Sequence, residues 1–171
     1  MNFELIGVIK WIKLGIVILL AVIMIVFMNA CIVFYLNPTP GLKWMEDDFQ
    51  QNKESLYIVK NFLVEREHGV IIRSFEFDEK MLIGDTPIDE KTIDAINELF
   101  HLGYSQIRCY GNWIVFLRWS TRHEGRGIVF SIDGSIPDES EYPYHVSLEL
   151  LSEDGWYFYI SNYREWVRRN S

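Results

Sequence analysis

The sequence has only two cysteines, and they lie in parts of very different character. Cys31 is inside a long apolar run, whereas Cys109 is inside the strand-like stretch QIRCYG. A bridge between two such segments is not expected, so disulfides do not support this fold. A lone cysteine in a strand is ordinarily a small buried hydrophobe. The sequence therefore predicts that Cys109 packs in the core and is not a nucleophile.

Motifs that carry catalysis or bind metals are also missing. The sequence has no HExxH, no CxxC, no GxSxG and no Walker-type glycine loop. The four histidines are scattered along the chain: His68, His101, His123 and His145. We therefore expect no enzyme, no metal site and no cofactor. A hydrolase that uses His123 or the carboxylates of Asp133 and Glu139 is an alternative with little support.

One acidic loop has the ligand type that calcium prefers. The stretch DGSIPDESEYPY concentrates four carboxylates: Asp133, Asp138, Glu139 and Glu141. Their spacing differs from that of an EF-hand loop, and Pro137 and Pro143 are typical of turns. A solvated loop is the favoured interpretation.

Charge is absent from residues 14–36, LGIVILLAVIMIVFMNACIVFYL, where Asn29 is the single polar side chain. At a rise of about 1.5 Å per residue a helix of this length reaches roughly 35 Å, enough to cross a bilayer core. Lys10 and Lys13 precede it, which favours a cytoplasmic N-terminus and an extracellular C-terminal domain. The sequence predicts an N-terminal segment 1–13, a single-pass membrane helix 14–36 and a Pro/Gly spacer 37–41.

The stretch MNAC around Cys31 raises a second possibility, that of a lipid-bearing cysteine. Ala30 fits a bacterial lipobox, but Asn29 fits poorly, and the apolar run continues through IVFYL after the cysteine. An apolar run of this length is also long for a signal peptide. An uncleaved signal anchor is favoured over a lipoprotein, and both place the protein at the cell membrane.

Basic residues are scarce after the spacer. From Gly41 onward there are 14 Lys and Arg against 23 Asp and Glu, a net charge of −9. Nucleic acid and anionic lipid both reward basic residues, so neither suits this domain as a whole. A basic protein partner suits it better, although acidity for solubility alone is the commoner case.

Periodicity predicts an α+β domain over 42–171, with two helices packed on an antiparallel sheet of about five to seven strands. One apolar stripe runs from Leu42 to Leu63, and a second helix, with Thr86 and Pro87 at its entry, ends at Gly103. Strands are expected over 70–77, over the short stretch 80–84, and over 104–110, 113–120, 127–134, 145–152 and 156–161. Tight turns at 111–112 and 153–155 predict two hairpins, 121–127 predicts a turn, and 162–170 predicts a short final helix.

Aromatic side chains are abundant in the last third of the chain. In the strand WYFY, Trp156 and Phe158 point to one face while Tyr157 and Tyr159 point to the other, so both faces carry aromatics. One face can pack on the helices, and the other is covered by more chain or offered to a partner. The candidate partner-binding residues are Trp113, Trp119, Tyr157, Tyr159 and Arg118. Simple core packing of these residues stays open as the alternative.

The C-terminal run RGIVFSIDGSIPDES…VSLELLSEDGWYFYISNYREW, roughly residues 105–167, resembles a pattern of small uncharacterised proteins of Gram-positive bacteria. That resemblance implies no activity. In layout alone, a single N-terminal span followed by a compact α+β domain is similar to the TipC-like immunity proteins, though no motif matches residue by residue. Those proteins bind an exported toxin at the outer membrane surface, which implies a protein partner. The alternative is a structural or accessory subunit of an envelope complex, assembled through Asn29 in the span.

Overall fold

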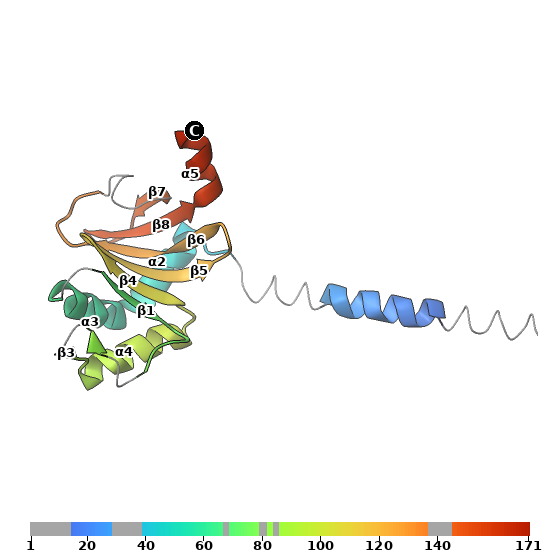
Figure 1. The fold of residues 1–171 in the computed structure, drawn as a ribbon, viewed down its shortest axis with the longest axis horizontal. Helices are drawn as coiled ribbons and strands as arrows, with labels where there is room; N and C mark the ends of the chain where they lie inside the picture. Colours follow the sequence, from blue (N-terminus) through green and yellow to red (C-terminus); the bar gives the residue numbers. More distant parts are fainter. Residues whose placement is uncertain (1–14, 29–38, 67–68, 79–81, 84–85, 137–144) are drawn as a thin grey trace, which may run out of the picture. The chain divides into compact units, whose positions relative to one another are not determined.

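The computed structural model describes residues 15–28, 39–66, 69–78, 82–83, 86–136 and 145–171 (Figure 1). The chain divides into two units, Met1–Thr39 and Pro40–Ser171. In the first unit, residues 15–28 form an α-helix. Among the described residues, no helix combines the length and the apolar character that a membrane crossing needs. The rest of the predicted span, Leu14 and residues 29–36, lies outside the described residues.

The second unit is an α+β domain with an antiparallel sheet, as predicted, but three helices rather than the predicted two contribute to its main core. Its six-stranded antiparallel sheet has the order β1-β4-β5-β6-β8-β7. The strands of this sheet are β1 (Val70–Arg73), β4 (Gln106–Tyr110), β5 (Trp113–Ser120), β6 (Glu124–Ser131), β7 (His145–Leu150) and β8 (Trp156–Asn162). A separate ladder pairs β2 (Leu82–Ile83) with β3 (Thr86–Pro87). The helices of this unit are α2 (Leu42–Gln51), α3 (Lys53–Val64), α4 (Glu90–His101) and α5 (Tyr163–Asn170).

The main core lies between the sheet and helices α2, α3 and α4, which gather on one face of it (Figure 1). Trp156 of β8 is fully buried at its centre. Its ring lies 5.1 Å from that of Phe49, 5.9 Å from Phe116 and 4.9 Å from Phe130. Cys109 is a free, buried cysteine in the same cluster. The predicted packing role of Cys109 is confirmed.

The long helix predicted from Leu42 to Leu63 is wrong in one respect, because it is broken at Asn52. Asn52 has φ −111° and ψ 15°, outside the helical region. Its side-chain amide donates hydrogen bonds to the backbone oxygen of Asp48 at 2.8 Å and to the Asp48 carboxylate at 3.1 Å. An asparagine amide competes with the helical backbone for such groups. The apolar stripe resumes in step after one residue, so periodicity alone did not reveal the break.

Several other predicted boundaries also differ from those of the structure. The first strand ends at Arg73, where a turn begins and the Glu76 amide donates to the Arg73 carbonyl at 3.0 Å. Helix α4 begins at Glu90, because the Asp89 side chain accepts the Thr92 amide at 3.0 Å and caps it. Thr86 and Pro87 therefore belong to β3 and not to the helix entry. The first residues of β6, predicted as a turn, are already in the sheet.

The local turn signals predicted the hairpins correctly. Tyr110 pairs with Trp113 across the Gly111-Asn112 turn. Leu150 pairs with Tyr157 across the second turn. The C-terminal helix forms as α5, whose first turn is capped by the Asn162 side chain accepting the Glu165 amide at 3.0 Å.

Candidate functional site

The sheet face opposite the helices carries a second, smaller apolar cluster. Its buried members are Trp113, Val115, Leu117, Val129 and Tyr159, with Tyr157 and Leu148 partly buried against it. Side chains of β8 alternate as expected, with Trp156 and Phe158 in the main core and Tyr157 and Tyr159 here. Trp113 is 1% exposed and Tyr159 2% exposed. These two predicted binding residues therefore lie beneath the surface, and Tyr157 is half-buried.

The other two predicted residues lie on the helix side, Arg118 by simple alternation along β5 and Trp119 because of a β-bulge. Leu117 pairs with Gly127 and Trp119 with Arg126, which leaves Arg118 as the extra residue in β5. The Arg118 guanidinium lies 4.9 Å from the ring of Trp44 in α2 and 3.8 Å from the Asp48 carboxylate. The Trp119 ring lies 5.9 Å from the Arg126 guanidinium. The five candidate residues are thus divided between the two faces of the sheet.

A groove of about 670 Å³ opens on the face opposite the helices. Leu117, Gly125 and Tyr159 line its inner part, and Ile71 and Tyr110 line it from the edge of the sheet. Ile71 is 45% exposed and Tyr110 is 58% exposed, so their side chains are accessible. No described helix belongs to the apolar cluster of this face. The groove thus has an accessible isoleucine and an accessible tyrosine beside buried aromatic side chains.

Glycine at position 125 keeps the inner part of the groove open. A Cβ atom at Gly125 would lie 2.9 Å from the Ser161 hydroxyl and 3.1 Å from the Leu117 side chain. At Gly127 a Cβ atom would lie only 2.1 Å from the Phe116 backbone oxygen. The two glycines therefore let β5, β6 and β8 approach closely beneath the groove.

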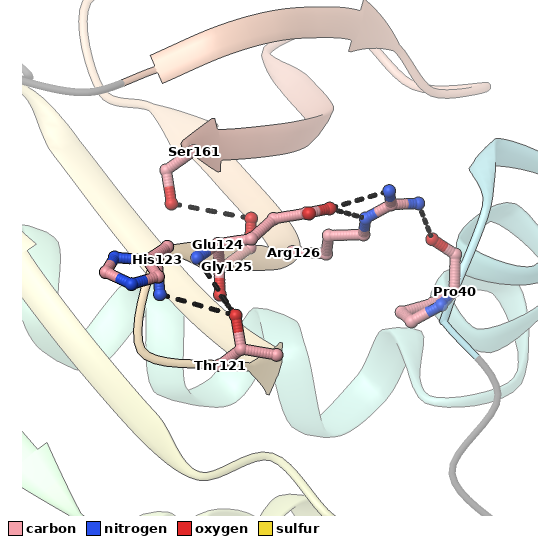
Figure 2. Close-up of polar contacts among 7 residues, drawn as sticks. All are labelled: Pro40, Thr121, His123, Glu124, Gly125, Arg126 and Ser161. Atoms are coloured by element: carbon pink, nitrogen blue, oxygen red, sulfur yellow. Dashed lines mark hydrogen bonds and ion pairs between the residues drawn. The ribbon is translucent and has the colours of Figure 1, made fainter. Parts of the chain in front are cut away.

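The turn between β5 and β6 forms one end of the groove and is fixed by Thr121 (Figure 2). The Thr121 hydroxyl accepts the amide of His123 at 3.3 Å and that of Glu124 at 3.1 Å. The Thr121 amide donates to the Glu124 carbonyl at 2.7 Å. The His123 carbonyl accepts the Tyr163 amide at 3.0 Å, which joins this turn to α5. His123 is thereby positioned at the groove without depending on its imidazole.

The charged lining of the groove is mainly basic. Arg108 donates from Nε to the Gln106 side chain at 2.6 Å. Within the described part of the chain, neither Arg108 nor Arg122 forms an ion pair. The one carboxylate of the lining, Glu124, is paired with Arg126 at 2.6 Å. The groove therefore offers two arginines beside its apolar surface.

Two of the residues considered for catalysis, His123 and Asp133, are not brought together. His123 precedes β6 and Asp133 follows it, so a strand of eight residues, roughly 25 Å long, separates them. Asp133 accepts hydrogen bonds from Ser135 and Asn112, and the Ser135 contacts hold the pKa of Asp133 below its usual value. Glu139 lies outside the described residues, as do Asp138 and Glu141. Among described residues no group of three His, Cys, Asp or Glu could hold a metal ion.

Cys109 is equally unsuited to nucleophilic chemistry. Burial raises the pKa of its thiol, so the reactive thiolate is disfavoured. Its side chain packs in the main core although its residue contributes to the groove lining. Among these described groups there is therefore no activated nucleophile.

The five candidate residues predicted from the sequence did not include the accessible groove residues Ile71 and Tyr110 or the half-buried Arg108. A usable signal was present: the alternation along β4 places Arg108 and Tyr110 on one face, and Ile71 pairs with Arg108. The predicted set favoured tryptophans, which are large side chains that are often buried rather than accessible.

No family model matches this chain, and neither a curated protein nor a solved structure matches it.

Proposed function

We propose that this chain is a membrane-tethered domain that binds a protein partner at the cell envelope, as an immunity protein binds an exported toxin. The observation that carries this proposal is the groove opposite the helices. It combines accessible Ile71 and Tyr110 with Arg108, and tyrosine and arginine are residue types that contribute strongly to protein interfaces. The buried Trp113 and Tyr159 support this surface from below.

The tether is supported by the character of the first helix. Residues 15–28 carry apolar side chains on every side, as in Ile16, Leu19 and Ile23. A helix that is apolar all round belongs in a protein interior or a membrane, and not on a domain surface. The apolar sequence continues on to residue 36. A single-pass anchor accounts for both features, and Lys10 and Lys13 before it favour a domain outside the cell.

Site-specific photo-crosslinking in intact cells tests the groove. A photoreactive phenylalanine at Tyr110 or Ile71 is expected to give one discrete protein adduct. The matched control is the same group at Glu54, which is exposed on helix α3 and away from the groove. Adducts of equal yield from all three positions, or none from the groove, contradict the proposal.

Protease treatment of intact cells tests the tether and its orientation. Cleavage after Gly41 in intact cells is the expected result. Protection in intact cells with cleavage in opened cells contradicts an extracellular domain and moves the search for a partner to the cytoplasmic side.

A further inference from the structure

The chain enters the domain at a defined end of the sheet. Arg126 of β6 donates from one guanidinium nitrogen to the carbonyl of Pro40 at 2.9 Å (Figure 2). The same guanidinium pairs with Glu124 at 2.6 Å, beside the β5–β6 turn. Pro40, the first residue of this unit, is therefore fixed next to that turn.

Basic residues gather at this same end. His123 of the turn and Arg164 and Arg168 of α5 line one shallow hollow. Arg122 is next to His123 in the turn. The Glu165 carboxylate forms ion pairs with the guanidinium groups of Arg169, at 2.8 Å, and of Arg168, at 3.5 Å. Together with Arg126, this basic end consists of five arginines: Arg122, Arg126, Arg164, Arg168 and Arg169.

The charge of the basic end is opposite to that of the domain. Five arginines are set against two glutamates, Glu124 and Glu165, which gives a local charge of +3. The domain from Gly41 onward carries −9. Arg122 and Arg164 are exposed and form no ion pair with any described residue. Such segregation in an acidic domain directs one end toward a negatively charged surface and the remainder away from it.

We infer that the basic end, Arg122 with Arg126, Arg164, Arg168 and Arg169, docks on an anionic phospholipid surface and so fixes how the domain stands on the membrane. The inference rests on the tether of the proposed function, because that tether brings Pro40 near the lipid headgroups. Basic side chains close to an anionic bilayer are attracted to it, and each strengthens the association about fivefold. Tyr163, which is 49% exposed at the start of α5, adds an aromatic side chain of the type found at bilayer interfaces. Net acidity argued against lipid binding by the whole domain, but this end is locally basic.

Hydrogen exchange of the full-length protein in vesicles tests the docking. Vesicles of phosphatidylcholine alone are compared with vesicles that also contain phosphatidylglycerol. Backbone amides of α5 and of the β5–β6 turn are expected to exchange more slowly in the anionic vesicles, and high salt is expected to abolish the difference. Amides of α4 serve as the internal reference and are expected to be unaffected.

Charge-matched variants separate a local surface from net charge. R122Q/R164Q is expected to weaken the docking equilibrium roughly 25-fold, while R122K/R164K retains it. R73Q/K91Q removes the same net charge from β1 and α4 and is expected to behave like the unaltered protein. Equal loss of protection in R122Q/R164Q and R73Q/K91Q overturns the inference.

Alkaline carbonate extraction of the neutral vesicles distinguishes failure of the tether from failure of the docking. Release of the protein there overturns both proposals. If the protein is retained but hydrogen exchange in α5 and the β5–β6 turn does not depend on lipid charge, the docking alone is overturned. That result is expected if the basic end binds an acidic protein instead.

Discussion

The hydroxyl of Tyr104 donates a hydrogen bond of 2.5 Å to the carboxylate of Asp48, and both side chains are buried. The same carboxylate accepts from Asn52 at 3.1 Å and lies 3.8 Å from Nε of Arg118. Helix α2 is therefore joined to the segment before β4 and to β5 by polar contacts as well as by apolar packing. Burial raises the pKa of Asp48, although Tyr104, Arg118 and Asn52 each act to lower it.

Tyr104→Phe is expected to lower the free energy of unfolding by about 1–3 kcal/mol. The substitution keeps the ring but removes a donor from a buried carboxylate, whose desolvation is then less compensated. Tyr110→Phe, at an exposed position, is the control and is expected to change little. Urea unfolding followed by near-ultraviolet circular dichroism makes the comparison. Equal stabilities of the two variants contradict the role assigned to the Tyr104 hydroxyl.

The raised pKa of Asp48 predicts a particular pH dependence. The folded state binds the Asp48 proton more tightly than the unfolded state, so this group favours folding most below its usual pKa of 3.8. That contribution is lost as the pH rises through the folded-state pKa. The unaltered protein is therefore expected to lose stability relative to Asp48→Asn as the pH rises above about 4. A stability difference that does not vary with pH over this window contradicts the prediction.

The contribution of Glu153 to stability is expected to depend on pH in the opposite direction to that of Asp48. The Glu153 carboxylate accepts hydrogen bonds from Lys53 and Tyr57, of which the Lys53 contact is the larger cause of its lowered pKa. This contribution is present above the usual pKa of 4.5 and is lost as the pH falls through the folded-state value. Glu153→Gln is expected to lose stability relative to the unaltered protein at neutral pH, with the gap closing in acid. Thermal unfolding at several pH values measures the stability difference between the two proteins. A difference that widens in acid contradicts the prediction.

Gly127→Ala is expected to destabilise the domain by about 1–3 kcal/mol. The new methyl group would lie 2.1 Å from the Phe116 backbone oxygen, so β5 and β6 must move apart. Gly41→Ala is a suitable control, because no atom lies within 4 Å of the corresponding position. Chemical unfolding of both variants decides the matter, and a Gly127→Ala protein as stable as the control is evidence against the close approach.

Trp113 and Tyr110 are adjacent across a hairpin but are expected to respond differently to truncation. Trp113→Ala removes a side chain that is 1% exposed and is expected to cost about 3–5 kcal/mol. Tyr110→Ala, at 58% exposed, is expected to change stability by less than about 0.5 kcal/mol while weakening partner binding. Thermal unfolding and the crosslinking yield report the two effects. A Tyr110→Ala protein that is unfolded shows that the tyrosine is structural.

Elements that depend on short-range signals were predictable from the sequence. Gly111 adopts φ 55°, which glycine tolerates, and the hairpin around it was predicted correctly. The final helix was also predicted, from a short polar stretch with aromatic residues. The alternation of Trp156 and Tyr157 correctly separated the two faces of β8, because that alternation follows from strand geometry alone.

Features that depend on distant parts of the chain were not predictable in this way. The bulge at Arg118 places Arg118 and Trp119 on the same side, against simple alternation, and nothing local marks it. Alternation also says which face a side chain occupies but not what covers that face. Alternation therefore did not reveal that Trp113 is buried.

The position of Trp156 has a consequence for the synthesis of the protein. Its ring contacts Phe49 of α2 and Tyr57 of α3, which lie roughly 100 residues earlier in the chain. Helices α2 and α3 therefore leave the ribosome long before the strand that completes their packing. Contacts of such large sequence separation fold slowly and leave apolar surface exposed for longer. Emergence of β8 from the ribosome, rather than formation of the first helices, is the event that allows this domain to close.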